Sequence, residues 1–108
     1  MLRKAFVMTL KFGCEAEYHK RHNPIWPELE QVLKEHGVAN YSIFFQRETH
    51  QLFAYAEIES EERWQAIAQT PVCRRWWAYM KELMLTNDDD SPAAFDLKEV
   101  FHIEKGKS

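Results

Sequence analysis

The strands predicted from this sequence carry apolar side chains on both of their faces. The first predicted strand, residues 3–10, alternates Phe6 and Met8 with Ala5 and Val7. The third, residues 52–58, has the same two-sided pattern. Because successive side chains on a strand point to opposite faces, a sheet of such strands must be covered on both sides. Helices can cover one face, and a second copy of the chain is the simplest cover for the other. The pattern therefore predicts a two-fold homodimer, although a long loop or the C-terminal segment can also cover part of that face.

The predicted elements follow the order strand, helix, strand, strand, helix, strand. Strands are expected over residues 3–10, 38–45, 52–58 and 97–103, and helices over residues 15–23 and 27–36, and from Ser60 and Thr70 onward. Serine and threonine are favoured N-caps, proline suits the first helical position, and glycine commonly follows a helix end. The polar residues 47–51 indicate a hairpin between the second and third strands. This order predicts an α+β fold of the ferredoxin-like βαββαβ type, with an antiparallel sheet and helices on one face.

Length and charge limit the classes of protein that this chain can belong to. With 108 residues it is expected to form one domain over residues 1–108, with a frayed tail at 104–108. Acidic and basic residues are mixed and the net charge is -3, so no nucleic-acid surface is predicted. No stretch has transmembrane length, so no membrane partner is expected. Cys14 and Cys73 fit no metal or redox spacing, and although one disulfide is formally possible, two reduced cysteines in a cytoplasmic protein are the simpler interpretation.

Tyr18 and His22 form the first candidate site. They are four residues apart, so they share one face of the predicted helix. Pro24 is expected to end this helix just past His22, which can place the imidazole at the mouth of a pocket. A phenol and an imidazole together can bind a polyhydroxylated ligand and transfer a proton. In the alternative interpretation, His22 simply caps the C-terminus of its helix, where a cation is favoured.

Trp76, Trp77 and Tyr41 are further candidates. Adjacent helical residues point about 100° apart, so Trp76 and Trp77 cannot both face one core. One of them is expected at an edge, a pocket or a partner, where its ring can form an apolar wall for a sugar; the alternative is one core and one interface tryptophan. Tyr41 shares a strand face with Ile43 and Phe45, and a core tyrosine is the simpler interpretation of its position alone.

Motifs for metal or nucleotide chemistry are not predicted. The acidic run 88–90 lacks the glycine and the alternating ligands of a calcium loop. The other histidines are scattered and form no zinc set with the cysteines. The chain has only 3 glycines and no glycine-rich phosphate loop. We therefore expect a site without metal or cofactor.

Several stretches of the sequence are similar to one known family. They are residues 3–8, 17–18, 21–29, 40–41, 57–64, 73–77 and 99–101. The run His-Asn-Pro-Ile-Trp-Pro at 22–27 and the paired tryptophans are specific when found together. On these stretches, residues 1–103 resemble the L-rhamnose mutarotases, small cytoplasmic sugar epimerases with a dimeric α+β barrel fold.

The resemblance implies an isomerase that interconverts the α and β anomers of L-rhamnose. It implies that His22 is the proton donor and that Tyr18, Tyr41, Trp76 and Trp77 bind the sugar. Mutarotation protonates the ring oxygen while a base removes the anomeric proton, and a bound water or a tyrosine hydroxyl can act as that base. The reaction needs no redox step, in agreement with the expected absence of a cofactor.

Two rival functions remain open at the level of the sequence. A monooxygenase acting on haem or quinol-like substrates can use the same barrel with Asn, Trp and His in its pocket. A non-catalytic ligand-binding or dimerisation module is the other, with His22 as a helix cap. Neither requires the combination of Tyr18, His22 and the paired tryptophans.

Overall fold

The centre of the fold is an antiparallel sheet. In the computed structural model, which describes residues 1–106, the strands are β1 (Leu2–Thr9), β2 (Val38–Gln46), β3 (Gln51–Ile58) and β4 (Phe95–Leu97). Their order across the sheet is β2-β3-β1-β4, and every neighbouring pair is antiparallel. This is the ferredoxin-like βαββαβ arrangement, so the predicted α+β fold class is confirmed.

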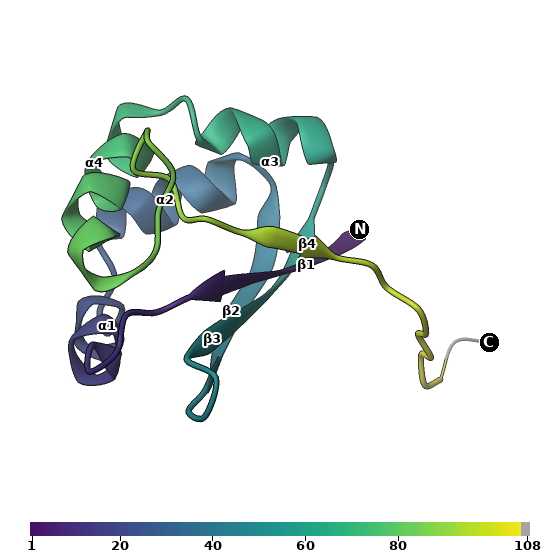
Figure 1. Cartoon of the computed structure of the whole chain (residues 1–108). Helices are drawn as coiled ribbons and strands as arrows, with labels where there is room; N and C mark the ends of the chain where they lie inside the picture. Colours follow the sequence, from purple (N-terminus) through teal and green to yellow (C-terminus); the bar gives the residue numbers. More distant parts are fainter. Residues whose placement is uncertain (107–108) are drawn as a thin grey trace.

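The helices cover one face of this sheet, as Figure 1 shows. They are α1 (Glu15–Arg21), α2 (Pro27–Glu35), α3 (Glu61–Ile67) and α4 (Pro71–Met80), followed by a 3₁₀ turn at Lys81–Leu83. Each of the two crossovers, from β1 to β2 and from β3 to β4, is thus split into two helices. The split occurs at residues that favour helix ends, and it lets the chain wrap around one side of the sheet.

Local sequence signals account for the helix ends. The Ser60 side chain accepts a hydrogen bond from the Arg63 backbone N–H at 3.1 Å, which caps α3. The Thr70 hydroxyl accepts from the Cys73 N–H at 3.4 Å and caps α4, whose first residue is Pro71. Helix α1 ends at Arg21 with His22 as its C-cap, two residues before the predicted end at residue 23 and ahead of Pro24.

Gly37 joins α2 to β2 through a backbone that only glycine adopts easily. Its φ is +89°, in the left-handed region. A Cβ at this position would lie 2.9 Å from the Cβ of Glu59, at the end of β3. The close approach lets the Gly37 carbonyl accept a hydrogen bond from the Glu59 N–H at 3.0 Å, which ties the start of β2 to the end of β3.

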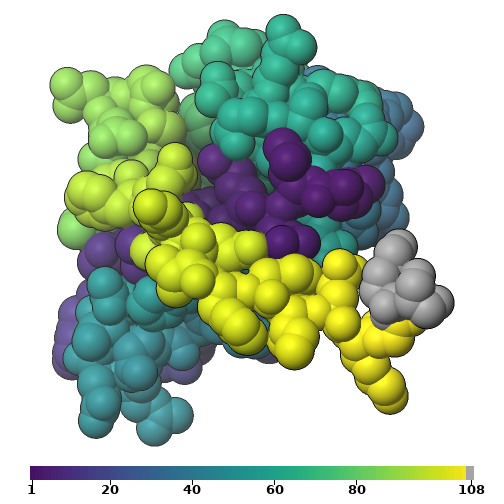
Figure 2. Space-filling model, turned by 90° about the vertical axis from the view of Figure 1, so that its right-hand side faces the viewer, coloured from purple at the N-terminus to yellow at the C-terminus, as the bar shows by residue number. Residues whose placement is uncertain are grey.

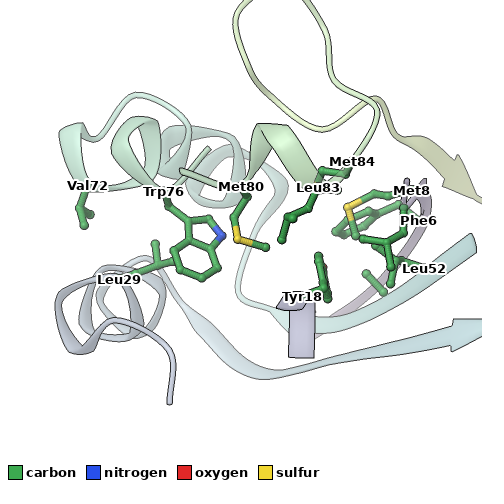
Figure 3. Packing of buried hydrophobic residues seen from close by; sticks show 12 residues of the cluster. Phe6, Met8, Tyr18, Leu29, Leu52, Val72, Trp76, Met80, Leu83 and Met84 are labelled. Atoms are coloured by element: carbon green, nitrogen blue, oxygen red, sulfur yellow. The ribbon is translucent and has the colours of Figure 1, made fainter. Parts of the chain in front are cut away.

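The hydrophobic core lies between the sheet and the helices. From the sheet it takes Phe6 and Met8 of β1 and Leu52 of β3, and from the helices it takes Tyr18, Leu29 and Trp76, among others. Figure 3 shows Trp76 reaching from α4 toward these buried side chains. Leu52 is 1% exposed and Met8 is 4% exposed, so the middle of the helix-side face of β1 and β3 is buried.

The opposite face of the sheet carries apolar side chains in cross-strand rows. One row runs Phe44, Phe53, Val7 and Phe95, and the next runs Ser42, Tyr55, Ala5 and Leu97. Phe44 is 64% exposed and Phe95 is 71% exposed. Figure 2 views the molecule from the side where the C-terminal segment crosses β1. The two-sided apolar pattern of the predicted strands is therefore present, and we call these two rows the open sheet face.

The last strand differs from the prediction. It covers Phe95–Leu97 and not residues 97–103. Residues 98–103 have no strand partner in the described chain and their side chains are exposed, including Val100 at 88% and Phe101 at 76%. Only three residues pair with β1, at Ala5, Phe6 and Val7. Strand β1 itself continues to Leu2, so the pairing ends because the chain after Leu97 leaves the edge of the sheet. Within the predicted frayed tail, residues 104–106 are exposed, and residues 107–108 lie outside the described part of the chain.

Candidate active site

All the sequence-predicted site residues border one cavity on the helix side of the sheet. The cavity has a volume of about 1280 Å³, and its lining includes Tyr18, His22, Tyr41, Trp76 and Trp77. This volume exceeds that of a monosaccharide, and most of the lining side chains are apolar or aromatic, as in typical small-molecule sites. The lining residues come from β1, β2 and β3 and from all four helices.

Tyr18 and His22 lie against each other on α1. Their ring centroids are 4.4 Å apart and the ring planes make an angle of 33°. Tyr18 is 9% exposed and belongs to the core, whereas His22 is half-buried at the helix end. The spacing of four residues thus brings phenol and imidazole together, with the imidazole on the outer side.

The His22 ring has a fixed tautomer. Its Nδ1 lies 2.9 Å from the backbone carbonyl oxygen of Tyr18. A carbonyl only accepts hydrogen bonds, so Nδ1 carries the hydrogen, and Nε2 is the ring nitrogen left without this contact. Burial lowers the pKa of the imidazole below its ordinary value of 6.5, although the bond to Tyr18 acts in the opposite direction and the neighbouring His19 adds to the lowering. The lowered pKa makes the imidazolium a stronger acid.

Trp76 and Trp77 occupy different environments, as their adjacency on a helix requires. Trp76 is 8% exposed, and its ring meets the His22 ring edge-on, with centroids 5.2 Å apart and an angle of 89°. Trp77 is half-buried, and the Arg74 guanidinium lies 5.5 Å from its ring centroid. The structure therefore places Trp76 in the same contact group as Tyr18 and His22, and Trp77 along the cavity wall.

Tyr41 belongs to a second aromatic group on the sheet side of the cavity. Its ring lies 6.4 Å from that of Phe6 and 5.6 Å from that of Trp64. Trp64 is half-buried and also lines the cavity, but it was not among the predicted site residues. From the sequence it is simply an apolar position on α3, and only its contacts with Phe6 of β1 and Tyr41 of β2 show that it lies beside the pocket.

Both tyrosine hydroxyls keep their protons at neutral pH. Burial raises the pKa of the Tyr18 phenol above its ordinary value of 10.0. Burial also raises the pKa of Tyr41, and the nearby Tyr18 phenol adds to this effect. Neither phenol is therefore a resident phenolate base. Each can donate a hydrogen bond to a ligand hydroxyl and accept another from it.

Metal-ligand chemistry has no ready site in the described part of the chain. Residues 1–106 contain no group of three or more His, Cys, Asp or Glu side chains arranged to hold a metal ion. In the acidic run, the Asp89 carboxylate accepts a hydrogen bond from the Ser91 N–H at 3.0 Å, which closes a tight turn. Among the described residues no helix is long and apolar enough to cross a membrane.

The sequence matches one protein family over most of its length. The family is described as L-rhamnose mutarotase, and the match covers residues 3–103. A protein named L-rhamnose mutarotase from Opitutus terrae is 62% identical over 104 residues, which cover 96% of this chain and 100% of the relative.

Solved structures agree with this match. The crystal structure of an L-rhamnose mutarotase from Formosa agariphila superposes with a TM-score of 0.88 and 39% identity, covering 96% of this chain and 100% of that chain. A dimeric ferredoxin-like protein from an uncultured marine organism has a TM-score of 0.61 at 14% identity, with 97% and 96% coverage. An antibiotic biosynthesis monooxygenase has a TM-score of 0.61 at 11% identity, with 93% and 99% coverage. The last two likenesses show the fold alone.

The L-rhamnose mutarotases thus match this chain in both sequence and fold, whereas the monooxygenase is similar to it in fold alone. This chain belongs to the L-rhamnose mutarotase family.

Proposed function

We propose that this protein interconverts the α and β anomers of L-rhamnose and that His22 is its catalytic proton donor. One observation carries the proposal: within a cavity of monosaccharide size or more, the His22 ring contacts both Tyr18 and Trp76, and its Nδ1 is bonded to the Tyr18 carbonyl. This leaves Nε2 for proton exchange with a sugar. The family match and the name of the Opitutus terrae relative support L-rhamnose as the substrate.

The chemistry is a reversible ring opening. Nε2 of the His22 imidazolium donates its proton to the ring oxygen as the bond between C1 and that oxygen breaks. A base removes the proton of the anomeric hydroxyl, which becomes the carbonyl of the open-chain aldehyde. Rotation about the C1–C2 bond and the reverse proton transfers give the other anomer. A well-placed acid or base contributes about 10²–10⁴-fold to such a step.

A bound water is our candidate for the base. The raised pKa values of Tyr18 and Tyr41 argue against a phenolate, although either hydroxyl can orient the water by a hydrogen bond. The aromatic walls suit the sugar itself, because its C–H groups pack on ring faces while its hydroxyls bond to the phenols. The 6-methyl group of rhamnose fits an apolar wall better than a hydroxymethyl group does.

The test is magnetisation exchange in NMR at anomeric equilibrium. One anomeric proton of L-rhamnose is saturated and the loss of signal at the other anomer is followed. We expect rapid transfer with the wild-type protein and little above the spontaneous rate with His22→Ala. A His22→Ala protein as active as the wild type would contradict the role of His22.

The rival functions make different predictions in the same sample. A non-catalytic binding module would show sugar binding without exchange, and His22→Ala would leave its ligand affinity unchanged. A monooxygenase would show neither, and a bound chromophore in the purified protein would favour it. Absence of exchange with the wild-type protein would remove L-rhamnose mutarotation from consideration.

We also propose that the protein is a homodimer that associates through the open sheet face, with residues 1–108 forming one mutarotase domain. The rows of exposed apolar side chains, including Phe44 at 64% exposure, support this. The exposed C-terminal residues Val100 and Phe101 are available to contact the second copy. We propose the cytoplasm as its location, where the free thiols of Cys14 and Cys73 stay reduced.

A further inference from the structure

Arg21, the residue before His22, is half-buried, and each of the three nitrogens of its guanidinium group donates a hydrogen bond. Its side chain is only 10% exposed. Within α1, its Nε donates to the Glu17 carboxylate at 2.8 Å. Its other contacts reach a different part of the fold, at the end of α4 and the 3₁₀ turn that follows. An arginine held in this way is a structural connection and not a solvated surface charge.

The contacts with α4 use each side of the guanidinium fork. Nη1 donates to the backbone carbonyl of Tyr79 at 2.6 Å, and Nη2 bonds the Glu82 carboxylate at 2.6 Å. Tyr79 lies next to the last residue of α4, where backbone carbonyls have no partner within the helix. The guanidinium carbon also lies 4.1 Å from the centroid of the Tyr79 ring, in cation–π contact. Arg21 therefore caps α4 from the end of α1.

Besides Arg21, helix α1 contacts α4 at this end through the ring of its C-cap, His22, which meets Trp76 edge-on. Its only buried residue is Tyr18, one turn earlier. The chain before α1 is held by the Lys11 N–H, which donates to the Leu83 carbonyl at 2.7 Å. The start and middle of α1 are thus fixed by the backbone and by the core, and the side chain of Arg21 fixes its end.

The fixed end is the part of α1 that carries the proton-transfer group. His22 follows Arg21 directly, and its ring meets Trp76, which lies one turn before Tyr79 on α4. The distance between the His22 ring and the α4 wall of the cavity therefore depends on how closely α1 and α4 are joined. We propose that Arg21 is a positioning residue for proton transfer by His22, a proposal that rests on the proposed mutarotase function.

Lysine cannot take the place of this arginine. An ammonium group is a compact point charge, and it cannot reach a carbonyl and two carboxylates in the fixed directions of a planar fork. Arg21→Lys keeps the positive charge but loses the planar group that makes the three hydrogen bonds at once. Tyr18 stays buried in the variant, so the sugar-binding surface on α1 changes less than the position of His22.

The experiment measures kcat and KM for L-rhamnose by NMR exchange in Arg21→Lys and Arg21→Ala. We expect kcat to fall about 10- to 100-fold, the usual effect of a small misplacement of a reacting group, with KM changed by less than about threefold. Guanidinium ion at millimolar concentration should restore part of the activity of Arg21→Ala. Circular dichroism checks that each variant is folded. If Arg21→Ala is unfolded, the kinetic constants of Arg21→Lys are enough to test the positioning role.

Arg63→Ala is the matched control. Arg63 likewise bonds a carboxylate one turn earlier, Glu59, and the carbonyl of Glu35 at the end of another helix. It joins α3 to α2 and makes no contact with His22. We expect a loss of stability in this variant with kcat close to wild type and with no response to added guanidinium.

NMR titration of the His22 ring separates this proposal from the proposed function. In Arg21→Lys, looser packing should expose the ring and move the His22 pKa up toward its ordinary value, with no such change in Arg63→Ala. If the wild-type protein does not accelerate exchange, the proposed mutarotase function is wrong. The His22 pKa measured in Arg21→Lys then remains as the test of the positioning role of Arg21. A titration that is unchanged in Arg21→Lys, or an unchanged kcat in an active protein, overturns the positioning role.

Discussion

At the scale of single residues, the chemistry of the site depends on how His22 is held. Its Nδ1 bond to the Tyr18 carbonyl fixes which nitrogen exchanges protons, and burial between Tyr18 and Trp76 lowers its pKa. A donor must be protonated before it acts. The two effects therefore oppose each other: the imidazolium is a stronger acid, but a smaller fraction of the protein carries it at neutral pH.

This opposition gives a pH dependence with a definite sign. Because the pKa of His22 lies below 6.5, the imidazolium form is lost as the pH rises through that lowered value. We expect kcat/KM for mutarotation, corrected for the spontaneous rate, to fall with rising pH over this range and to level off below it. Exchange NMR between pH 5 and 8 measures the profile. A rate that rises with pH would assign His22 the opposite role, as the base.

At the scale of elements, α4 places its two tryptophans in different environments, one in the core and one along the cavity wall. Trp76 is buried in the core and also contacts His22, whereas Trp77 is half-buried and lines the cavity. Thr70 and Pro71 fix where this helix begins, so they also fix which of the two rings points to the core.

Alanine substitutions should distinguish these two environments. Trp76→Ala should lower the free energy of unfolding by about 3–5 kcal/mol, as expected for a buried aromatic ring, and also lower activity. Trp77→Ala should cost only about 1–2 kcal/mol because less surface is buried, while raising KM for the sugar. Urea unfolding and exchange kinetics on both variants provide the measurements. Equal losses of stability would contradict this difference.

Most elements could be predicted from local signals, and the exception is informative. The caps at Ser60 and Thr70 and the proline at Pro27 mark helix starts through backbone chemistry that acts within a few residues. The last strand was placed wrongly, because the apolar residues of 97–103 read as a strand. In the structure only Phe95–Leu97 pair with β1, and this pairing depends on the whole sheet and not on local sequence.

The candidate site was predictable where it depends on spacing within one helix. The four-residue separation of Tyr18 and His22, and the adjacency of Trp76 and Trp77, are visible in the sequence. Contacts between elements are not. Trp64 of α3 lines the cavity beside Phe6 of β1 and Tyr41 of β2, and no pattern in the sequence encodes these contacts.

At the scale of the whole molecule, apolar side chains are exposed on the open sheet face and on the C-terminal segment. The radius of gyration is 14.4 Å, above the value of about 13 Å expected for a chain of this length. Figure 1 shows the reason, since the chain after β4 extends away from the body of the fold. A shape of this kind suits association with a second copy.

A charge on the open sheet face should weaken that association. Phe44 lies in the apolar row opposite Phe53 and is exposed, so Phe44→Glu should leave the fold intact and raise the dimer dissociation constant at least tenfold. Sedimentation velocity over a range of concentrations measures this. Gln31→Glu, on the exposed side of α2, adds the same charge elsewhere and should have no effect. A wild-type protein that stays monomeric at high concentration would contradict the proposed interface.

The sheet also separates two surfaces with different tasks. The cavity lies on the helix side, and the apolar rows lie on the other side, with one layer of backbone between them. If two copies associate through the open sheet face, as proposed, each keeps its own proposed site residues on the helix side of its sheet. Filling one site has no evident means of changing the affinity of the other, and sugar binding should follow a simple hyperbola without cooperativity. Association would then serve the stability of the protein and not the regulation of its activity.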